Sequence, residues 1–136
     1  MSVSTADRQA LQDVMLNYAA AVDERDRARY AACFTEDVEV VGFGGGTIEG
    51  RANWLDYVFT ALDKYASSQH LLGPMLASME GDIAVTRSDF QATHFLKGEE
   101  PGPIVLWATY KTQMRLEEGQ WRICRHELEA RGSKHF

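Results

Sequence analysis

The spacing of hydrophobic residues changes near Ser67, and this change constrains the fold more than any other feature of the chain. Before Ser67, apolar side chains recur three and four residues apart, which is the repeat of an amphipathic helix. After Ser67, apolar and polar residues alternate, as they do in strands with one buried face. Helices are therefore expected first and a meander of strands second. This order is typical of an α+β fold.

Three helices are predicted before the change. A capping box precedes the first, and the apolar stripe behind it predicts a helix over residues 5–23, with Asp23 at its end. A short second helix is expected from Arg25 to Cys33, with its charged residues, Arg25 included, facing water. The third is expected from Arg51 to Tyr65, after a run of glycines that reads as a turn.

Five strands are predicted, separated by turn signals rich in glycine, proline and acidic residues. Their expected ranges are 38–43, 69–79, 83–96, 104–116 and 120–131, and residues 134–136 are expected to fray. Strands of this length curl when they twist. We therefore expect a cone-shaped, curved, mixed or antiparallel sheet, closed on one side by the three helices and hollow inside.

Length and charge limit the organisation and the partners of the protein. A chain of 136 residues with 45% hydrophobic residues is expected to form one domain, residues 1–136. The net charge of -6 disfavours binding to nucleic acid or to an anionic membrane, and no apolar run is long enough to cross a bilayer. Cys33 and Cys124 have no CxxC spacing, and no signal sequence is visible, so free thiols and a cytoplasmic location are expected.

A set of ordered positions along almost the whole chain resembles the SnoaL-like family of the nuclear transport factor two-like superfamily. These positions are Leu11, Tyr18, Asp23, Asp26, Phe34-Thr35-Glu36-Asp37-Val38, Gly50, Gln69-His70, Gly81-Asp82-Ile83-Ala84, His94, Tyr110 and Gly119-Gln120-Trp121-Arg122-Ile123. The pattern is most similar to the group that contains scytalone dehydratase and hexachlorocyclohexane dehydrochlorinase. The resemblance implies a cystatin-like α+β barrel, a small hydrophobic ligand, no cofactor, and a homo-oligomer that is a dimer or a trimer.

Asp23 and His70 occupy the positions of the acid–histidine pair in that group. A carboxylate bonded to one imidazole nitrogen fixes the tautomer and leaves the other nitrogen free to accept a proton. Asp23 continues the apolar stripe of the first helix, where an ionised group needs a partner. An alternative from the residues alone is that Asp23 caps the next helix and that His70 is an ordinary buried histidine.

Three further residues are candidates for binding a substrate oxygen: Tyr18, His94 and His126. His94 alternates with Phe90 on one strand and lines the pocket if that face points inward. The resemblance places His126 where the dehydrochlorinase has an arginine, and Tyr18 where it has a lysine. A phenol and a neutral imidazole are weaker anion acceptors, so an oxygen substrate fits better than a halide.

Aromatic residues are candidates for the pocket wall, with ordinary core packing as the alternative. They are Tyr30, Phe43, Trp54, Phe59, Phe90, Trp107 and Tyr110. Tyr110 matches a cavity-facing position of the family. No metal is expected, because the histidines lack the close spacing of metal-binding motifs.

The leading hypothesis is a cofactor-independent lyase or isomerase of the dehydratase type, acting on a hydrophobic, cyclic, oxygen-bearing molecule. In it, His70 is the general base and Asp23 orients it. One alternative is acid–base catalysis by Asp23 alone, as in polyketide cyclases. Another is a protein without catalysis, which binds a ligand or acts as an assembly subunit like the small subunits of ring-hydroxylating dioxygenases.

Overall fold

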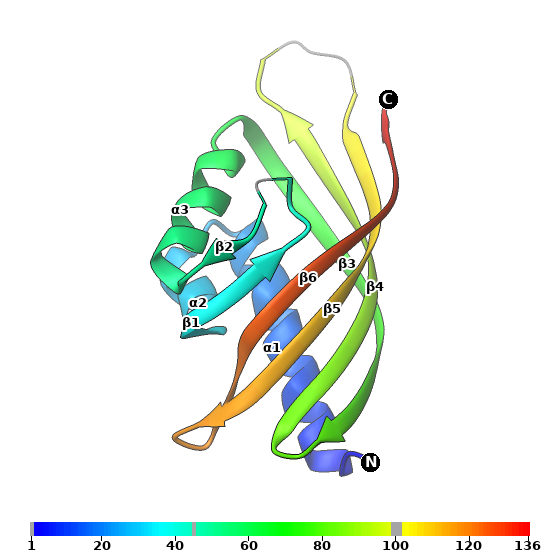
Figure 1. Cartoon of the computed structure of the whole chain (residues 1–136). Helices are drawn as coiled ribbons and strands as arrows, with labels where there is room; N and C mark the ends of the chain where they lie inside the picture. The colour runs from blue at the N-terminus through cyan, green and yellow to red at the C-terminus, as the bar shows by residue number, and fades with distance from the viewer. Residues whose placement is uncertain (1, 45, 99–101) are drawn as a thin grey trace.

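The computed structural model describes residues 2–44, 46–98 and 102–136 (Figure 1). In it, helices come first and long strands follow, as the change of period predicts. The elements are α1 (Thr5–Asp23), α2 (Arg27–Ala31), β1 (Phe34–Val41), β2 (Ile48–Glu49), α3 (Arg51–Leu62), β3 (Tyr65–Glu80), β4 (Ile83–Leu96), β5 (Ile104–Glu117) and β6 (Gln120–His135).

Helix α1 has the predicted bounds, because a capping residue precedes it and an apolar stripe runs along its buried face. Ser4 accepts a hydrogen bond from the Asp7 amide, which satisfies one free donor of the first turn. The Asp7 carboxylate is used elsewhere and accepts a bond from the indole of Trp121. The apolar stripe of α1, which runs from Leu11 to Val22, is buried against the sheet. Asp23 is therefore delivered to the edge of the interior.

The strands form one six-stranded sheet with the order β2-β1-β6-β5-β4-β3. Strands β3 to β6 are antiparallel neighbours, as a meander requires, whereas β1 runs parallel to β6. The sheet is thus mixed and strongly curved, and the expected α+β fold is confirmed. Strand β2, which pairs with β1, lay outside the predicted elements.

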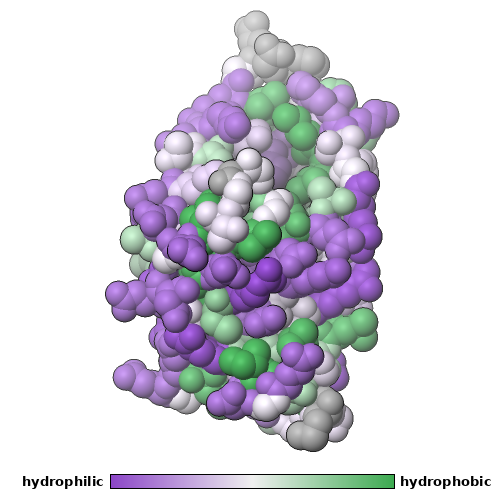
Figure 2. Space-filling model, in the orientation of Figure 1, coloured by the Kyte–Doolittle hydropathy of each residue, from purple (hydrophilic) through white to green (hydrophobic). Residues whose placement is uncertain are grey.

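The three helices lie on the concave side of the sheet, with α1 crossing behind it (Figure 1). The inward alternate residues of β4 and β5 are buried there, including Phe90, Ala108 and Tyr110. On the face shown in Figure 2, hydrophobic side chains form small groups separated by hydrophilic ones. Within the described residues, no helix is both long enough and apolar enough to span a bilayer.

Several boundaries and orientations differ from the expectations. Helix α2 is one turn long and starts after Arg25, whose φ of 58° ends the preceding helical path. Arg25 does not face water, because its guanidinium bonds to the Val22 carbonyl and the Ser68 hydroxyl. Residues 134 and 135 are not frayed either, since β6 continues through them and His135 pairs with Ile104.

Exposed apolar side chains on the outer face of the sheet include Leu71, Leu76 and Trp107. Trp107 was a candidate for the pocket wall, and that assignment is wrong. It pairs with Gln91 on β4, one residue out of phase with inward Phe90 and Leu106. The expected homo-oligomer stays a prediction.

Candidate functional site

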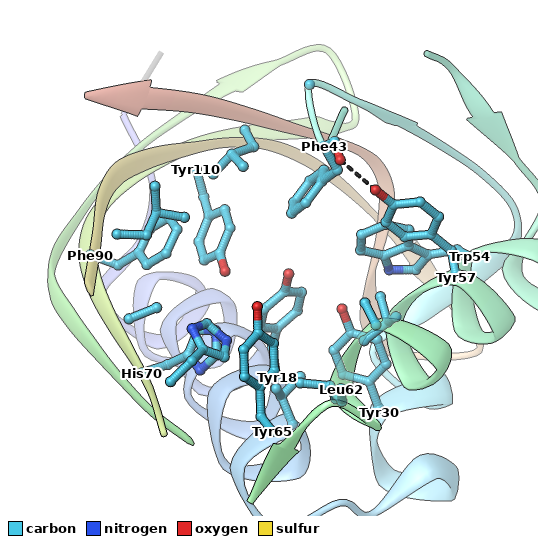
Figure 3. Close-up of a pocket in the computed structure, with 18 residues that line it drawn as sticks. Tyr18, Tyr30, Phe43, Trp54, Tyr57, Leu62, Tyr65, His70, Phe90 and Tyr110 are labelled. Carbon is cyan, nitrogen blue, oxygen red and sulfur yellow. Dashed lines mark hydrogen bonds between the residues drawn. The ribbon is translucent and has the colours of Figure 1, made fainter. Parts of the chain in front are cut away.

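A cavity of about 300 Å³ lies between the helices and the concave face of the sheet (Figure 3). Its lining comes from all three helices and from four strands. The residues are Tyr18, Val22, Tyr30, Gly42, Phe43, Trp54, Tyr57, Val58, Ala61, Leu62, Tyr65, His70, Phe90, Ala92, His94, Leu106, Tyr110 and Leu128. The described lining is apolar and aromatic apart from tyrosine hydroxyls, two histidines and the Trp54 indole N–H. Such a space suits a small hydrophobic molecule with few polar groups.

Asp23 and His70 meet at the side of this cavity. Asp23 Oδ1 lies 2.8 Å from His70 Nδ1, and Asp23 Oδ2 accepts a 2.7 Å bond from the His70 backbone amide. Ser68, two residues before His70 on the same face of β3, donates a 2.9 Å bond to Oδ1. The carboxylate is thus held by three donors from one strand. The His70 side chain is only 8% exposed.

The protonation of this pair follows from its contacts. Burial alone raises the pKa of Asp23, but the hydrogen bonds from the His70 ring, the His70 amide and Ser68 outweigh it and hold the pKa below 3.8. An ionised carboxylate only accepts, so His70 Nδ1 carries a proton. In this tautomer the ring keeps its lone pair on Nε2. His70 lines the cavity, whereas Asp23 lies behind it.

The alternative role for Asp23 does not match the structure. Asp26, not Asp23, caps α2 by accepting a bond from the Arg29 amide. Sequence reasoning missed Ser68 and Arg25, which extend the pair into a network. Ser68 carried a signal, because a residue two positions before His70 on a strand shares its face. Arg25 carried none, since its inward path depends on a left-handed backbone conformation.

Tyr18 and His126 come together, but only Tyr18 lines the cavity. His126 Nε2 lies 2.9 Å from the Tyr18 hydroxyl, and His126 Nδ1 lies 3.0 Å from the Thr112 hydroxyl. His126 is fully buried, and burial lowers its pKa to about 3, so the ring is neutral. Thr112 is a further residue that the sequence did not reveal, because its contact depends on the register of β5 and β6.

His94 lines the cavity beside His70, with ring centroids 5.6 Å apart. Burial, followed by the repulsion of His70 and Arg25, lowers the pKa of His94 to about 4. His94 is therefore neutral at neutral pH and can give a hydrogen bond to a ligand oxygen. The Tyr65 ring packs against it, with centroids 4.6 Å apart.

The remaining aromatic candidates separate into two groups. Tyr30, Phe43, Trp54, Phe90 and Tyr110 line the cavity. Phe59, on α3, is not part of the lining and packs its ring against Tyr30. Gly42 also lines it at a φ of +92°, and a Cβ there would lie 2.2 Å from the Leu128 carbonyl oxygen. That position therefore cannot carry a side chain.

The structure also bears on thiols and metals. Cys33 and Cys124 are free, as predicted, and burial raises the pKa of Cys33 to about 12. Within residues 2–44, 46–98 and 102–136, no three His, Cys, Asp or Glu side chains converge on a point where a metal ion would fit. That no metal or cofactor takes part stays a prediction.

The two neutral histidines predict how stability depends on pH. In the unfolded chain both take up protons near pH 6.5, but in the folded protein only near 4 (His94) and 3 (His126). Their contribution to stability is therefore complete above pH 6.5 and is lost as the pH falls toward 4. Urea unfolding measured at several pH values in this range should show a steady fall in the free energy of unfolding. The fall per pH unit should be smaller in His94→Gln. An equal slope in both proteins would contradict the assignment.

Comparisons with solved structures support the fold. The protein from Novosphingobium aromaticivorans that is provisionally named a scytalone dehydratase shares 22% identity, with a TM-score of 0.88, 96% of this chain covered and 88% of that chain. Hexachlorocyclohexane dehydrochlorinase from Novosphingobium barchaimii shares 22% identity, with a TM-score of 0.86, and the match covers 96% of this chain and 90% of that chain. A protein of unknown function with a cystatin-like fold, from Nostoc punctiforme, shares 20% identity with a TM-score of 0.78, and the match covers 96% of both chains.

No curated protein matches this chain. The model of the SnoaL-like domain, however, matches residues 3–127. That stretch contains α1 with Asp23, β3 with His70, and nearly all of the cavity lining. From the matched positions and from the fold that surrounds them, we conclude that this chain belongs to the SnoaL-like domain family.

Proposed function

We propose that the protein is a cofactor-independent lyase or isomerase of the dehydratase type, which acts on a hydrophobic, cyclic, oxygen-bearing molecule. The observation that carries the proposal is the 2.8 Å contact between His70 Nδ1 and Asp23, in a histidine that lines an apolar cavity. The names of two structural neighbours, a dehydratase and a dehydrochlorinase, support an elimination.

The proposed reaction uses His70 as base and Asp23 as the residue that orients it. His70 Nε2 removes a proton from the carbon beside a carbonyl, and the electron pair of that C–H bond forms an enolate. The enolate expels a hydroxyl group from the neighbouring carbon, and the same proton returns from His70 to the departing oxygen. Water and an unsaturated ketone leave, and His70 is again neutral.

Water fits as the leaving group better than chloride does. No Lys or Arg occurs among the described residues that line the cavity, so a departing anion would find no fixed positive charge. The hydroxyls of Tyr18, Tyr30, Tyr65 and Tyr110 point into it instead (Figure 3). Neutral donors of this kind stabilise an oxygen on which charge develops.

A panel of bicyclic β-hydroxy ketones tests this proposal. Incubation with the protein should produce the conjugated ketone, seen as new absorbance, and the protein should also catalyse deuterium uptake beside the carbonyl in heavy water. The parent ketones, which lack the hydroxyl group, should show the exchange alone. Ketones that bind without exchange or elimination would contradict the proposal and favour a binding protein.

A further inference from the structure

Thr112, His126 and Tyr18 form a line of hydrogen-bonded side chains that ends at the cavity. The two contacts are 3.0 Å, from Thr112 Oγ1 to His126 Nδ1, and 2.9 Å, from His126 Nε2 to Tyr18 Oη. The three residues are 2%, 0% and 2% exposed, so water does not compete for these bonds. The line connects the interior of the sheet with the space where a ligand would lie.

The number of protons decides the direction of these bonds. A neutral imidazole has one N–H and one acceptor nitrogen. If Tyr18 donated to His126, the His126 Nδ1–H would donate to Thr112, and the buried Thr112 proton would have no acceptor within the described part of the chain. In the opposite direction Thr112 donates to Nδ1, and Nε2–H donates to the Tyr18 oxygen. This direction satisfies Thr112 and both ring nitrogens of His126. It leaves the Tyr18 proton on the cavity side, where the Tyr30 and Tyr110 side chains also lie.

Other hydrogen-bond donors line the same cavity. The indole nitrogen of Trp54 is buried and has no hydrogen-bond partner among the described residues, although Trp54 is part of the lining. Burial raises the pKa of the Tyr18, Tyr30 and Tyr110 hydroxyls well above 10, so all three keep their protons. The cavity therefore offers several neutral donors.

The shape of the cavity favours a flat ligand. The rings of Phe90 and Tyr110 stack with centroids 3.9 Å apart and planes 13° apart, so this wall of the cavity is built of rings in nearly parallel planes. Phe90 also stacks beside His70, with an interplanar angle of 18°. A planar ring along this wall can present its oxygen to the donors and its edge to His70.

We propose that Tyr18, held as a hydrogen-bond donor by Thr112 and His126, binds the exocyclic oxygen of a flat cyclic ketone or phenol. His126 and Thr112 are positioning residues, since they act through Tyr18. The ligand class rests on the proposed function, because the oxygen that Tyr18 binds would be the carbonyl oxygen of the ketone that His70 deprotonates. The oxygen-binding role of Tyr18 does not depend on the chemical step.

Binding of para-nitrophenol tests the role of Tyr18 without any reaction. The wild-type protein is expected to bind this probe, and Tyr18→Phe should bind it roughly 3- to 10-fold more weakly, as expected for one lost hydrogen bond. The methyl ether, para-nitroanisole, whose oxygen is a poorer acceptor, should lose less. No binding to the wild type, or equal binding of para-nitrophenol to both proteins, would overturn the proposal.

Three threonine variants test the relay, by which we mean the hydrogen-bonded line from Thr112 through His126 to Tyr18. Thr112→Val should weaken para-nitrophenol binding, whereas Thr112→Ser, which keeps the hydroxyl, should restore it. Thr35→Val is the matched control, because Thr35 is also fully buried but bonds to the Ile123 carbonyl and not to a histidine. Equal affinities of Thr112→Val and Thr112→Ser would overturn the relay.

The tautomer of His126 provides a readout that a purely structural role would not move. Nitrogen NMR of the wild type should show a proton on Nε2 and none on Nδ1, and Thr112→Val should change this pattern. The reverse pattern in the wild type would overturn the direction of the relay. His70→Gln should still bind para-nitrophenol, because the site does not include His70. A wild-type protein that binds para-nitrophenol but catalyses neither elimination nor exchange would count against the proposed function and not against this site.

Discussion

Replacement of His70 by glutamine is expected to lower turnover roughly 10²- to 10⁴-fold, which is the usual contribution of a positioned general base. Glutamine keeps a polar side chain near Asp23 but has no nitrogen that accepts a proton at neutral pH. The fold should survive, because His70 lies at the edge of the core, beside a carboxylate. The assay is the elimination or deuterium exchange described above, with near-ultraviolet circular dichroism as the check on folding.

Two other histidines serve as matched controls for this variant. His135→Gln changes an exposed residue near the end of β6 and should leave turnover unchanged. His94→Gln removes a cavity residue that bonds to no carboxylate among the described residues. A loss of roughly 10-fold is expected from one weakened hydrogen bond. An active His70→Gln protein together with an inactive Asp23→Ala protein would point to catalysis by Asp23 alone.

The local spacing of apolar residues predicted the helix and the strands that surround Asp23 and His70. The apolar stripe placed α1 over residues 5–23, and the alternation of β4 turned Phe90 and His94 inward. Helical and strand periods are properties of short segments, so a single sequence reveals them. The prediction that Asp23 and His70 lie close together came from the family resemblance, since nothing in the spacing fixes how α1 packs against β3.

Contacts between distant segments were much less predictable. The parallel pairing of β1 with β6 aligns Phe34 with Ile123, and no turn signal records such a pairing. The contact between Thr112 and His126 likewise depends on the register of β5 and β6, which includes an irregularity between Gln113 and Met114. A shift of one residue in a register moves every side chain to the other face.

Polar residues near the cavity were harder to place than apolar ones. Arg25 was expected in water because charged side chains usually are exposed. In the structure it bonds to Ser68, which in turn bonds to Asp23, so a cation supports the carboxylate from behind. The opposite case is Trp107, an aromatic residue that lies on the outer face and bonds to Gln91. Chemical type predicts burial only on average, whereas strand phase decides it.

The second large effect is expected for Asp23→Asn. Of the groups that donate to Asp23, the backbone amide of His70 cannot become an acceptor, whereas the His70 ring nitrogen can. The His70 amide always donates, so an asparagine must place its oxygen at the Oδ2 position. Its NH₂ group then occupies the Oδ1 position and faces His70 Nδ1. Only an unprotonated Nδ1 can accept that bond. The ring proton would therefore move to Nε2, which faces the cavity.

This change of tautomer removes the lone pair that accepts the substrate proton, although both side chains remain in place. Turnover of Asp23→Asn should fall on the order of 10⁴-fold, the size seen when the same substitution reverses the tautomer of a catalytic histidine. Nitrogen NMR of His70 should show the proton on Nδ1 in the wild type and on Nε2 in the variant. Ser68→Ala is the control, since it removes one donor to Oδ1 without reversing the tautomer, and its loss should stay within roughly 10-fold. Wild-type turnover in Asp23→Asn, or an unchanged tautomer with lost turnover, would show that Asp23 does not act by orienting His70.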